Sequence, residues 1–186
     1  MKLIIGLGNP GKRYEKTRHN VGCLVANRLW SLVSSNAEWK LEKKFKSNIY
    51  KPETRDFILA KPQTFMNDSG NAVVALATFY KLHATDIYVI HDDLDIVLGE
   101  YKIQKGKGPH DHNGLNSIYN KLGSKDFWHV RVGIENRKNF SILGFQISKK
   151  MRGEKYVLQN FTEREVEIVD EIVDKIVKEL MRVFSN

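Results

Sequence analysis

The sequence has few of the residues and runs that mark several protein classes. Its 186 residues contain one cysteine, Cys23, and four prolines. A single cysteine cannot close an internal disulfide, so a disulfide-stabilised secreted framework is excluded. No run of about 18 apolar residues occurs, so we expect no membrane-spanning helix. The first residues lead directly into LIIGLG without a signal-peptide pattern, and we expect a cytoplasmic protein.

The residues that are present suit one folded domain. Hydrophobic residues make up 41% of the chain and charged residues 28%, which is typical of globular rather than disordered proteins. A length of 186 residues fits one hydrophobic core. We therefore expect a single domain over residues 1–186. Cys23 is interpreted as a small core residue on the apolar stripe of a helix rather than as a nucleophile.

Positive charge is concentrated in one part of the chain. The formal net charge is +8, but residues 162–186 carry 4 Lys/Arg against 7 Asp/Glu. Residues 1–161 therefore hold 26 basic against 15 acidic residues, a net charge of +11. This distribution favours a basic working surface for a phosphate-rich ligand. The alternative, a chain that is basic without such a partner, stays open.

Hydrophobic periodicity predicts an α/β fold. Strands are expected at residues 2–8, 45–51, 57–61, 87–91, 99–104 and 128–134, and helices at residues 21–33, 69–83, 114–122 and from residue 162 onward. Asn20 is expected to cap the first helix, and Glu165 to complete a capping box at the last. The expected architecture is one domain with a mixed, twisted β-sheet covered by helices and a long amphipathic C-terminal helix.

Two of the predicted helices carry an apolar stripe that should pack on the sheet. On the first helix the stripe comprises Val21, Leu24, Val25, Leu29, Leu32 and Val33. On the last helix it comprises Val166, Val169, Val173, Ile176, Leu180 and Val183.

The segment GLGNPG, residues 6–11, matches the G-x-G-x-x-G pattern of dinucleotide-binding loops and follows a predicted strand. Such a site needs a helix N-terminus at the third glycine and an acidic residue about 20 residues further on. Here residues 12–19 are polar, and helical spacing begins only near Val21. We interpret the glycines as a tight turn that projects Asn9 beyond the end of the strand.

His19, in the segment TRHN, stands between a polar loop and a predicted helix, where its side chain can face a cleft. A lone histidine is more often structural or merely exposed. However, HDDLD at residues 91–95 follows a predicted strand, and ligand clefts form at the carboxyl ends of such strands. Asp92 could accept the imidazole N–H of His19 and support its basic form. Asp93 and Asp95 are interpreted as capping or solvent-exposed groups.

The same acidic cluster allows a metal-site interpretation. Mg²⁺ sites often use one or two carboxylates together with substrate phosphates. His91, His110 and His112 could also be zinc ligands, but their spacing matches no recognised ligand pattern. We therefore predict no metal and no cofactor. A metal-dependent phosphoesterase remains an alternative.

Three asparagines, Asn9, Asn67 and Asn113, fall in predicted loops. Asparagine is common in turns, so each one alone has a structural interpretation. Together they supply amides that position water or stabilise a carbonyl oxygen that becomes negative in a transition state. No nucleophile-elbow motif surrounds a Ser, Cys or Thr, which favours direct attack by water over an acyl-enzyme.

Longer stretches carry a family resemblance. They are GLGNPGKRYEKTRHNVG at residues 6–22, KPQTFMNDSG at 61–70, and HDDLD at 91–95 followed by HNGLNS at 112–117. In this order they resemble the bacterial-type peptidyl-tRNA hydrolases, with a looser likeness through RVGI at 131–134. The resemblance implies cofactor-free hydrolysis of the ester between a nascent peptide and the terminal tRNA ribose. Peptidyl-tRNA is then the expected partner, and we expect a monomer.

The resemblance also implies site residues by position. His19 is similar to the family's catalytic base, Asp92 to its partner carboxylate, and Asn9 to the residue that helps distinguish N-blocked substrates from free aminoacyl-tRNA. Substrate contacts are implied at Tyr14, Phe65, Asn67 and Asn113, and phosphate contacts at Lys102 and Arg131. The positive charge around the predicted cleft, rather than the resemblance, adds Lys105 and Lys107 as expected contacts with tRNA phosphates.

The loop before HNG departs from the family pattern. Relatives usually have a glycine-rich run there, whereas this chain has Gly108-Pro109-His110-Asp111-His112. Proline fixes φ, and His110 and Asp111 add bulk, so the mobility and fit of this loop should differ. The main alternative function is a non-catalytic RNA-binding module with the same basic surface. Such a module would not need a His–Asp pair beside a group of asparagines.

Overall fold

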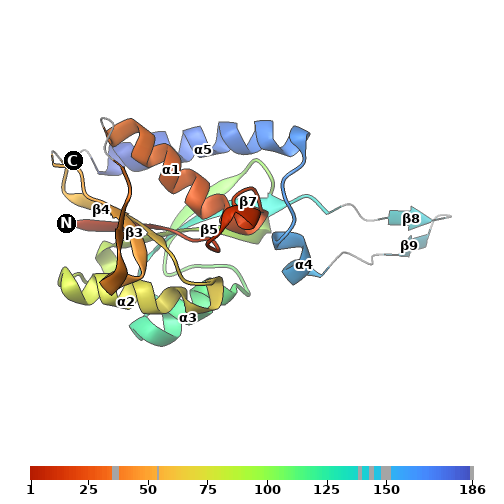
Figure 1. Cartoon of the computed structure of the whole chain (residues 1–186). Helices are drawn as coiled ribbons and strands as arrows, with labels where there is room; N and C mark the ends of the chain where they lie inside the picture. The colour runs from red at the N-terminus through yellow and green to blue at the C-terminus, as the bar shows by residue number, and fades with distance from the viewer. Residues whose placement is uncertain (35–37, 54, 138–139, 143–144, 148–151, 185–186) are drawn as a thin grey trace.

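A seven-stranded sheet forms the middle layer of the computed structural model, between two layers of helices (Figure 1). The structure describes residues 1–34, 38–53, 55–137, 140–142, 145–147 and 152–184. One position of the expected hairpin connection, residue 54, lies outside this range. In the described part, no helix is both long and apolar enough to cross a membrane.

The centre of the sheet is parallel, and its edges are antiparallel. The strand order is β2-β3-β4-β1-β5-β7-β6. Strand β1 pairs in parallel with β4 and β5, and β5 with β7, whereas the β2–β3, β3–β4 and β7–β6 pairs are antiparallel. The strands are β1 Lys2–Gly6, β2 Lys40–Glu42, β3 Ser47–Tyr50, β4 Phe57–Pro62, β5 Ile87–Val97, β6 Tyr101–Lys105 and β7 Trp128–Glu135.

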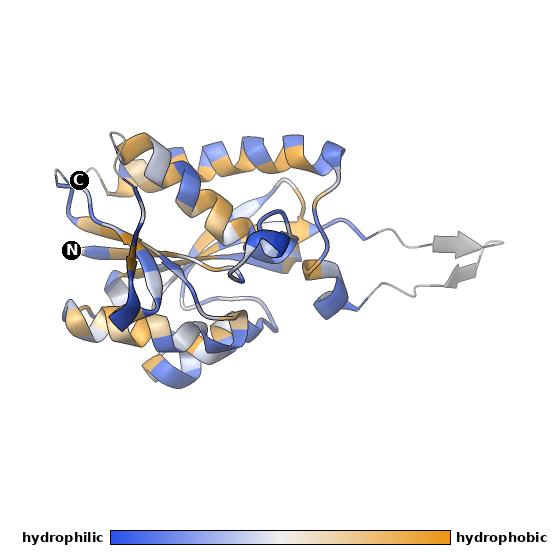
Figure 2. Cartoon of the chain, in the orientation of Figure 1, coloured by the Kyte–Doolittle hydropathy of each residue, from blue (hydrophilic) through white to orange (hydrophobic). Residues whose placement is uncertain are grey.

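The helices cover both faces of this sheet. They are α1 Val21–Val33, α2 Ser69–Phe79, α3 Asn113–Leu122, α4 Gly153–Val157 and α5 Glu163–Val183. Helices α1 and α5 share one hydrophobic core with one face of the sheet, and α2 and α3 share another core with the opposite face. Figure 2 shows the result on α5, where hydrophobic and hydrophilic positions alternate along the helix. The predicted single α/β domain with a mixed sheet and a long C-terminal helix is confirmed.

Most predicted elements are present, but several bounds differ. Strand β5 runs to Val97, so HDDLD lies inside a strand and not after one. Helix α2 ends at Phe79 rather than His83, because Lys81 adopts a left-handed conformation with φ 54° that breaks the helix. The short strand β2 and helix α4 were not predicted. Neither was a separate two-stranded sheet of β8 (Phe140–Ile142) and β9 (Phe145–Ile147).

The two predicted helix caps have different outcomes. The Thr162–Glu165 capping box at the start of α5 is confirmed. Asn20 precedes α1, but its side chain makes no capping bond. Instead, Asn20 Oδ1 accepts from the Asn9 N–H at 2.9 Å, and its Nδ2 donates to the Asn9 carbonyl at 2.9 Å. The asparagine therefore fixes the loop after β1 and not the helix.

The apolar stripes were assigned correctly only in part. Leu32 on α1 is 61% exposed, and Val166 and Val183 on α5 are also exposed. Ile172 and Val177 are buried in their place. Other residues at the same helix ends, Val33 on α1 and Phe184 after α5, do pack against the core, so the exposed positions differ in the side of the helix that they occupy.

Close packing brings the start of α1 against the sheet. A Cβ on Gly22 would lie 2.3 Å from the carbonyl oxygen of Ile90, and a Cβ on Gly6 would lie 2.4 Å from the carbonyl oxygen of Gly22. Only glycine allows this approach. The glycine at position 6 therefore serves helix–strand packing, while the turn that we predicted is made at Gly11, with φ 103°. This packing sets His19, just before α1, beside β5.

Candidate active site

His19 and Asp92 form a buried pair at the carboxyl side of the parallel strands. His19 Nδ1 lies 2.7 Å from Asp92 Oδ1, and both side chains are less than one-tenth exposed. Burial alone raises the pKa of Asp92, but the imidazoles of His19 and His112 outweigh it and hold the pKa well below its usual range. An ionised carboxylate only accepts hydrogen bonds, so the proton of His19 is on Nδ1. Nε2 is then the basic nitrogen.

The same carboxylate oxygen has a second imidazole partner, His112. His112 Nε2 lies 3.0 Å from Asp92 Oδ1. His112 is also the N-cap of α3, and its Nδ1 accepts from the backbone N–H groups of Gly114 and Leu115 at 3.1 and 3.3 Å. Because Nδ1 accepts, the proton is on Nε2, which donates to Asp92. The helix cap thus fixes the tautomer of His112 and the position of the carboxylate.

Two further histidines lie buried beside this group. His91 Nδ1 donates to the Asp92 carbonyl at 2.9 Å, and its Nε2 lies 3.2 Å from His129 Nδ1. Burial holds the pKa of His91 well below its usual value, and burial together with the charge of Arg131 lowers the pKa of His129 to about 4. Both are therefore neutral near neutral pH and act as polar parts of the core.

The pKa of His19 is set by two opposing effects. Burial lowers it, since a charged imidazole is poorly solvated there, but the attraction and hydrogen bond of Asp92 raise it more. The net pKa lies above the usual value of about 6.5. His19 is therefore a stronger base than a solvated imidazole.

Asn9 is held with its amide in a defined orientation. Its Oδ1 accepts from the Met66 N–H at 2.9 Å, so the amide nitrogen is the end left to donate. The backbone of Asn9 is fixed at the same time by Asn20. Two loops, one after β1 and one after β4, are joined by these bonds, and they place an amide N–H donor near His19.

A cleft of about 330 Å³ gathers four of the eight predicted substrate and tRNA residues. It is lined by His19 together with Asn9, Tyr14, Phe65, Asn67 and Asn113. The Phe65 ring is 56% exposed and forms an open apolar wall. A smaller hollow of about 190 Å³ shares His19 and Asn113 with this cleft and reaches Asp92. Six residues chosen from separate segments of the sequence thus border one space.

Comparisons with known proteins identify the family to which the chain belongs. The family model described as peptidyl-tRNA hydrolase matches residues 3–186. This chain belongs to the peptidyl-tRNA hydrolase family. It is 36% identical over 183 residues to a peptidyl-tRNA hydrolase of Coxiella burnetii (strain CbuG_Q212), covering 98% of this chain and 96% of the other. It is 47% identical to that of Lawsonia intracellularis (strain PHE/MN1-00), covering 71% of this chain and 66% of the other.

A solved structure has the same fold. The crystal structure of peptidyl-tRNA hydrolase from Acinetobacter baumannii superposes with a TM-score of 0.83 at 31% sequence identity, covering 97% of this chain and 87% of that one. The α/β fold that hydrophobic periodicity predicted is thus also the fold of a solved member of this family.

The basic residues expected to contact tRNA lie apart from the cleft. Lys102 and Lys105 are exposed on β6 at the edge of the sheet, and Lys107 is exposed in the loop that follows. Lys105 Nζ forms an ion pair with Asp126 at 3.2 Å. None of the three lines the cleft around His19.

Arg131 and Asp93 differ from expectation. Asp93 is buried rather than solvated, and its Oδ2 accepts from Arg131 Nε at 2.7 Å. Its Oδ1 accepts from the Asp95 N–H at 2.8 Å, a bond within strand β5 rather than a helix cap. Arg131 Nη1 donates to Gln104 at 3.0 Å. Two hydrogen bonds thus hold the Arg131 side chain against strands β5 and β6. The Arg131 side chain is also less exposed than that of Lys105 on the sheet edge.

Met66, in the loop after β4, also lines the cleft and was not predicted as a site residue. Three further cleft residues were missed from the sequence: Glu154, Val157 and Leu158. They come from α4 and the residue after it, which lack a chemical motif. His112 was considered only as a doubtful zinc ligand and as part of the altered loop. Its position at the start of a predicted helix was the available signal, since N-cap residues accept backbone hydrogen bonds.

Cys23 lies at the border of the core rather than inside it. Its thiol donates to the Gly6 carbonyl at 3.4 Å, and the side chain is half-buried. Burial raises the pKa of this thiol to about 11, with Lys61 opposing the rise. The thiol therefore stays protonated near neutral pH, which agrees with a structural rather than a nucleophilic role.

The atoms that could hold a metal are already bonded to one another. In the described part of the chain, His19, Asp92 and His112 are the group whose ligand atoms converge. The nitrogen–oxygen distances of 2.7 and 3.0 Å are hydrogen-bond lengths. Ligand atoms around a tetrahedral zinc ion, each about 2.0–2.2 Å from the metal, lie roughly 3.3 Å apart. The distances therefore fit two imidazoles that each donate a hydrogen bond to Asp92 better than they fit three ligands around a metal ion.

Proposed function

We propose that this chain hydrolyses peptidyl-tRNA by activating a water molecule with His19. The water attacks the carbonyl carbon of the ester that joins the peptide to the terminal ribose, and its proton moves to His19 Nε2. The observation that carries this proposal is the 2.7 Å bond between His19 Nδ1 and Asp92, which leaves Nε2 as the base at the cleft. General-base assistance of this kind contributes about 10²–10⁴-fold.

The same residues complete the reaction. Attack produces a negative oxygen on the former carbonyl, and the amide N–H of Asn9 is the donor placed to stabilise it. The ester C–O bond then breaks, and the imidazolium of His19 returns its proton to the ribose oxygen. Asp92 stabilises the imidazolium in between, because its ionised carboxylate lies against Nδ1. The products are a peptide carboxylate and a tRNA with a free terminal hydroxyl.

The remaining cleft residues contact the substrate. Phe65, Val157 and Leu158 offer apolar surface for the peptide, while Asn67 and Asn113 offer amides for its backbone. Tyr14 lines the same wall. Lys102, Lys105, Lys107 and Arg131 contribute the positive potential that holds the tRNA body. We further propose that the protein acts in the cytoplasm. We also propose that it is a monomer, which light scattering of the purified protein would test.

One assay tests the proposed function directly. N-acetyl-aminoacyl-tRNA and the free aminoacyl-tRNA are incubated with the protein, and release of the acyl group is measured. We expect rapid release from the N-acetylated substrate and little from the free one. Binding of both without release from either would contradict the proposal and favour a non-catalytic RNA-binding module.

A further inference from the structure

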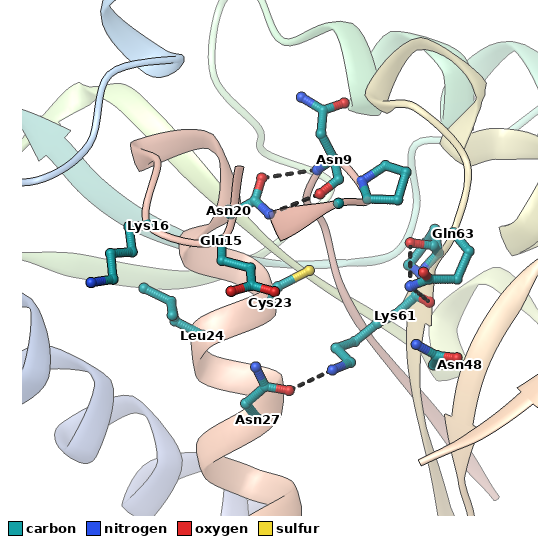
Figure 3. Close-up of a pocket in the computed structure, with 13 residues that line it drawn as sticks. Asn9, Glu15, Lys16, Asn20, Cys23, Leu24, Asn27, Asn48, Lys61 and Gln63 are labelled. Carbon is teal, nitrogen blue, oxygen red and sulfur yellow. Dashed lines mark hydrogen bonds between the residues drawn. The ribbon is translucent and has the colours of Figure 1, made fainter. Parts of the chain in front are cut away.

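A second hollow lies beside the Asn9 segment, and no step of the proposed mechanism uses it. Its volume is about 430 Å³, against about 330 Å³ for the cleft at His19. We call it the Lys61 pocket. It is bordered by α1, by strands β3 and β4, and by the loop that follows β1 (Figure 3). Asn9 borders both spaces, and in Figure 3 its side chain is directed away from the Lys61 pocket. The two spaces therefore adjoin at one residue.

Lys61 places a half-buried cation in this pocket. Its Nζ donates to Asn27 Oδ1 at 2.6 Å, across the space between β4 and α1 (Figure 3), and lies 4.2 Å from the centre of the Trp39 ring. Within the described residues, Lys61 forms no ion pair with a carboxylate. Burial lowers the pKa of Lys61, and the nearby Cys23 and Glu15 offset only part of this. The Asn27 amide and the Trp39 ring compensate only weakly for the cost of burying the Lys61 ammonium. An anionic ligand would therefore stabilise this ammonium.

The charges around the pocket define the ligand further. Lys16 and Lys61 supply two positive charges and Glu15 one negative charge, while Cys23 is protonated. The net charge is +1, which a single monoanion balances. The rest of the polar lining consists of neutral amides, among them Asn48 and Gln63, which lie on β3 and just after β4. Amides of this kind hydrogen-bond both the N–H and the C=O of a peptide.

We propose that the Lys61 pocket is a subsite for an acidic side chain of the nascent peptide, whose carboxylate pairs with the Lys61 ammonium. This inference rests on the proposed function, in which the peptide is held by its ester at His19, and the space at His19 adjoins the Lys61 pocket at Asn9. A tRNA phosphate is the less suitable anion. The exposed lysines that suit a polyanion lie on β6, four strands away from β4 in the sheet order, whereas this pocket holds one half-buried cation beside a carboxylate.

The test uses a series of N-acetyl-peptidyl-tRNAs of equal length. One Asp is placed at successive positions in an otherwise all-Ala peptide, and kcat/KM is measured for each. We expect one position to give kcat/KM about 10-fold above the all-Ala substrate, mainly through KM, which is the usual size for a partly exposed charge-assisted bond. Lys61→Met should abolish this preference and leave kcat/KM for the all-Ala substrate unchanged, which also shows that the variant folds.

Two variants serve as controls. Lys43→Met removes the same charge from an exposed turn before β3 and should keep the Asp preference. Lys61→Arg keeps a cation in the pocket and should retain most of it. An Asp preference at no position, with Lys61→Met indistinguishable from wild type, would overturn the inference while hydrolysis itself stands.

The same series of substrates shows whether the anion that binds Lys61 is a peptide carboxylate or a tRNA phosphate. If Lys61→Met raises KM equally for every peptide, including the all-Ala one, the pocket holds a tRNA phosphate and the assignment to the peptide is wrong. If the wild-type protein hydrolyses none of the substrates, the proposed function fails instead. The three failures are therefore distinguishable.

Discussion

The active cleft and the basic edge of the sheet hold their polar side chains in opposite ways. His19, Asp92 and His112 are all buried, and two hydrogen bonds meet on one carboxylate oxygen. Lys102 and Lys107 on the β6 side are exposed and free to reorient. A general base works only when its nitrogen is fixed relative to the reacting atoms. Attraction between a lysine and a phosphate needs no such precision.

This contrast separates two kinds of effect. Changes in the cleft should lower kcat, because they disturb the geometry of the chemical step. Changes along β6 should raise KM and alter the salt dependence, because they remove counterion release on binding. A substitution at the edge that lowered kcat, or one at His19 that altered only KM, would remove the distinction.

The largest effect is expected for His19→Ala. The substitution removes the nitrogen that takes the proton of the attacking water, so kcat should fall at least about 100-fold. Binding of a non-hydrolysable peptidyl-tRNA analogue should change little. Single-turnover rates and analogue affinity of the folded variant are the measurements to make. Near-normal turnover would exclude His19 as the base.

Asp92→Asn should have the next largest effect, a fall in kcat of about 10- to 100-fold with substrate binding retained. An asparagine amide can donate to His19 Nδ1, which moves the ring proton to Nε2 and blocks the base.

The pH dependence of the reaction should also report the His19–Asp92 pair. The base form of His19 exists above its pKa, which Asp92 raises, so wild-type kcat/KM should fall as the pH drops through a value above about 6.5. Without the carboxylate charge, burial lowers this pKa, and the rising limb of the pH profile should move to lower pH.

His112 provides a smaller, two-part effect. His112→Ala removes the donor to Asp92 and the cap of α3, whereas His112→Asn keeps a capping side chain that is too short to reach the carboxylate. Both variants should lose roughly 10-fold in kcat, since one charge-assisted hydrogen bond is removed. Only His112→Ala should also lose about 1 kcal/mol of stability in denaturant unfolding. Equal stability of the two variants would show that the cap contributes nothing.

The same contrast explains what could be predicted from sequence. Periodicity identified β1, α1, α3 and α5, because these elements bury one face or both faces in a regular pattern. It missed α4, which has five residues and no stripe, and it ended β5 too early, because Asp92 and Asp93 look like loop residues. Their polar side chains are tolerated inside a strand since each is paired, one with imidazoles and one with Arg131.

The site was predictable to a similar degree. The resemblance implied His19, Asp92 and Asn9 as site residues, and the fold brings His19 and Asn9 to one cleft. The second partner of Asp92 could not be read from the sequence, because it depends on a cap whose imidazole turns toward β5. Similarly, no pattern marks Lys61 as half-buried. Exposure depends on how α1 and β4 pack, which a single sequence does not reveal.

On the basic edge, replacing Lys105 and Lys107 with Ala should leave kcat unchanged and raise KM for peptidyl-tRNA. For every phosphate that a lysine no longer neutralises, the log–log salt dependence of binding should flatten by about 0.7 to 0.9. Because Lys105 already pairs with Asp126, Asp126→Asn should strengthen binding slightly. Lys43→Ala with Lys44→Ala, at the opposite end of the sheet order, is the matched control. If both double variants show the wild-type slope, the β6 side does not touch phosphate.

The smallest effect is expected from removal of metal ions. Exhaustive chelation with EDTA should leave kcat and KM within error of the untreated protein, because the converging atoms of His19, Asp92 and His112 are occupied by hydrogen bonds of 2.7 and 3.0 Å. His112 Nδ1 also accepts two backbone N–H groups, and a metal on Nε2 would displace the proton that holds Asp92. A metal at this cluster would therefore have to break the arrangement that orients the base. Loss of activity on chelation, with recovery on adding Zn²⁺ or Mg²⁺, would mean that the cluster is a metal site and that the acid–base mechanism is wrong. Added Zn²⁺ should instead inhibit, since it would bind the basic Nε2 of His19 that takes the proton of the attacking water, and a steady loss of kcat with rising Zn²⁺ measures that competition.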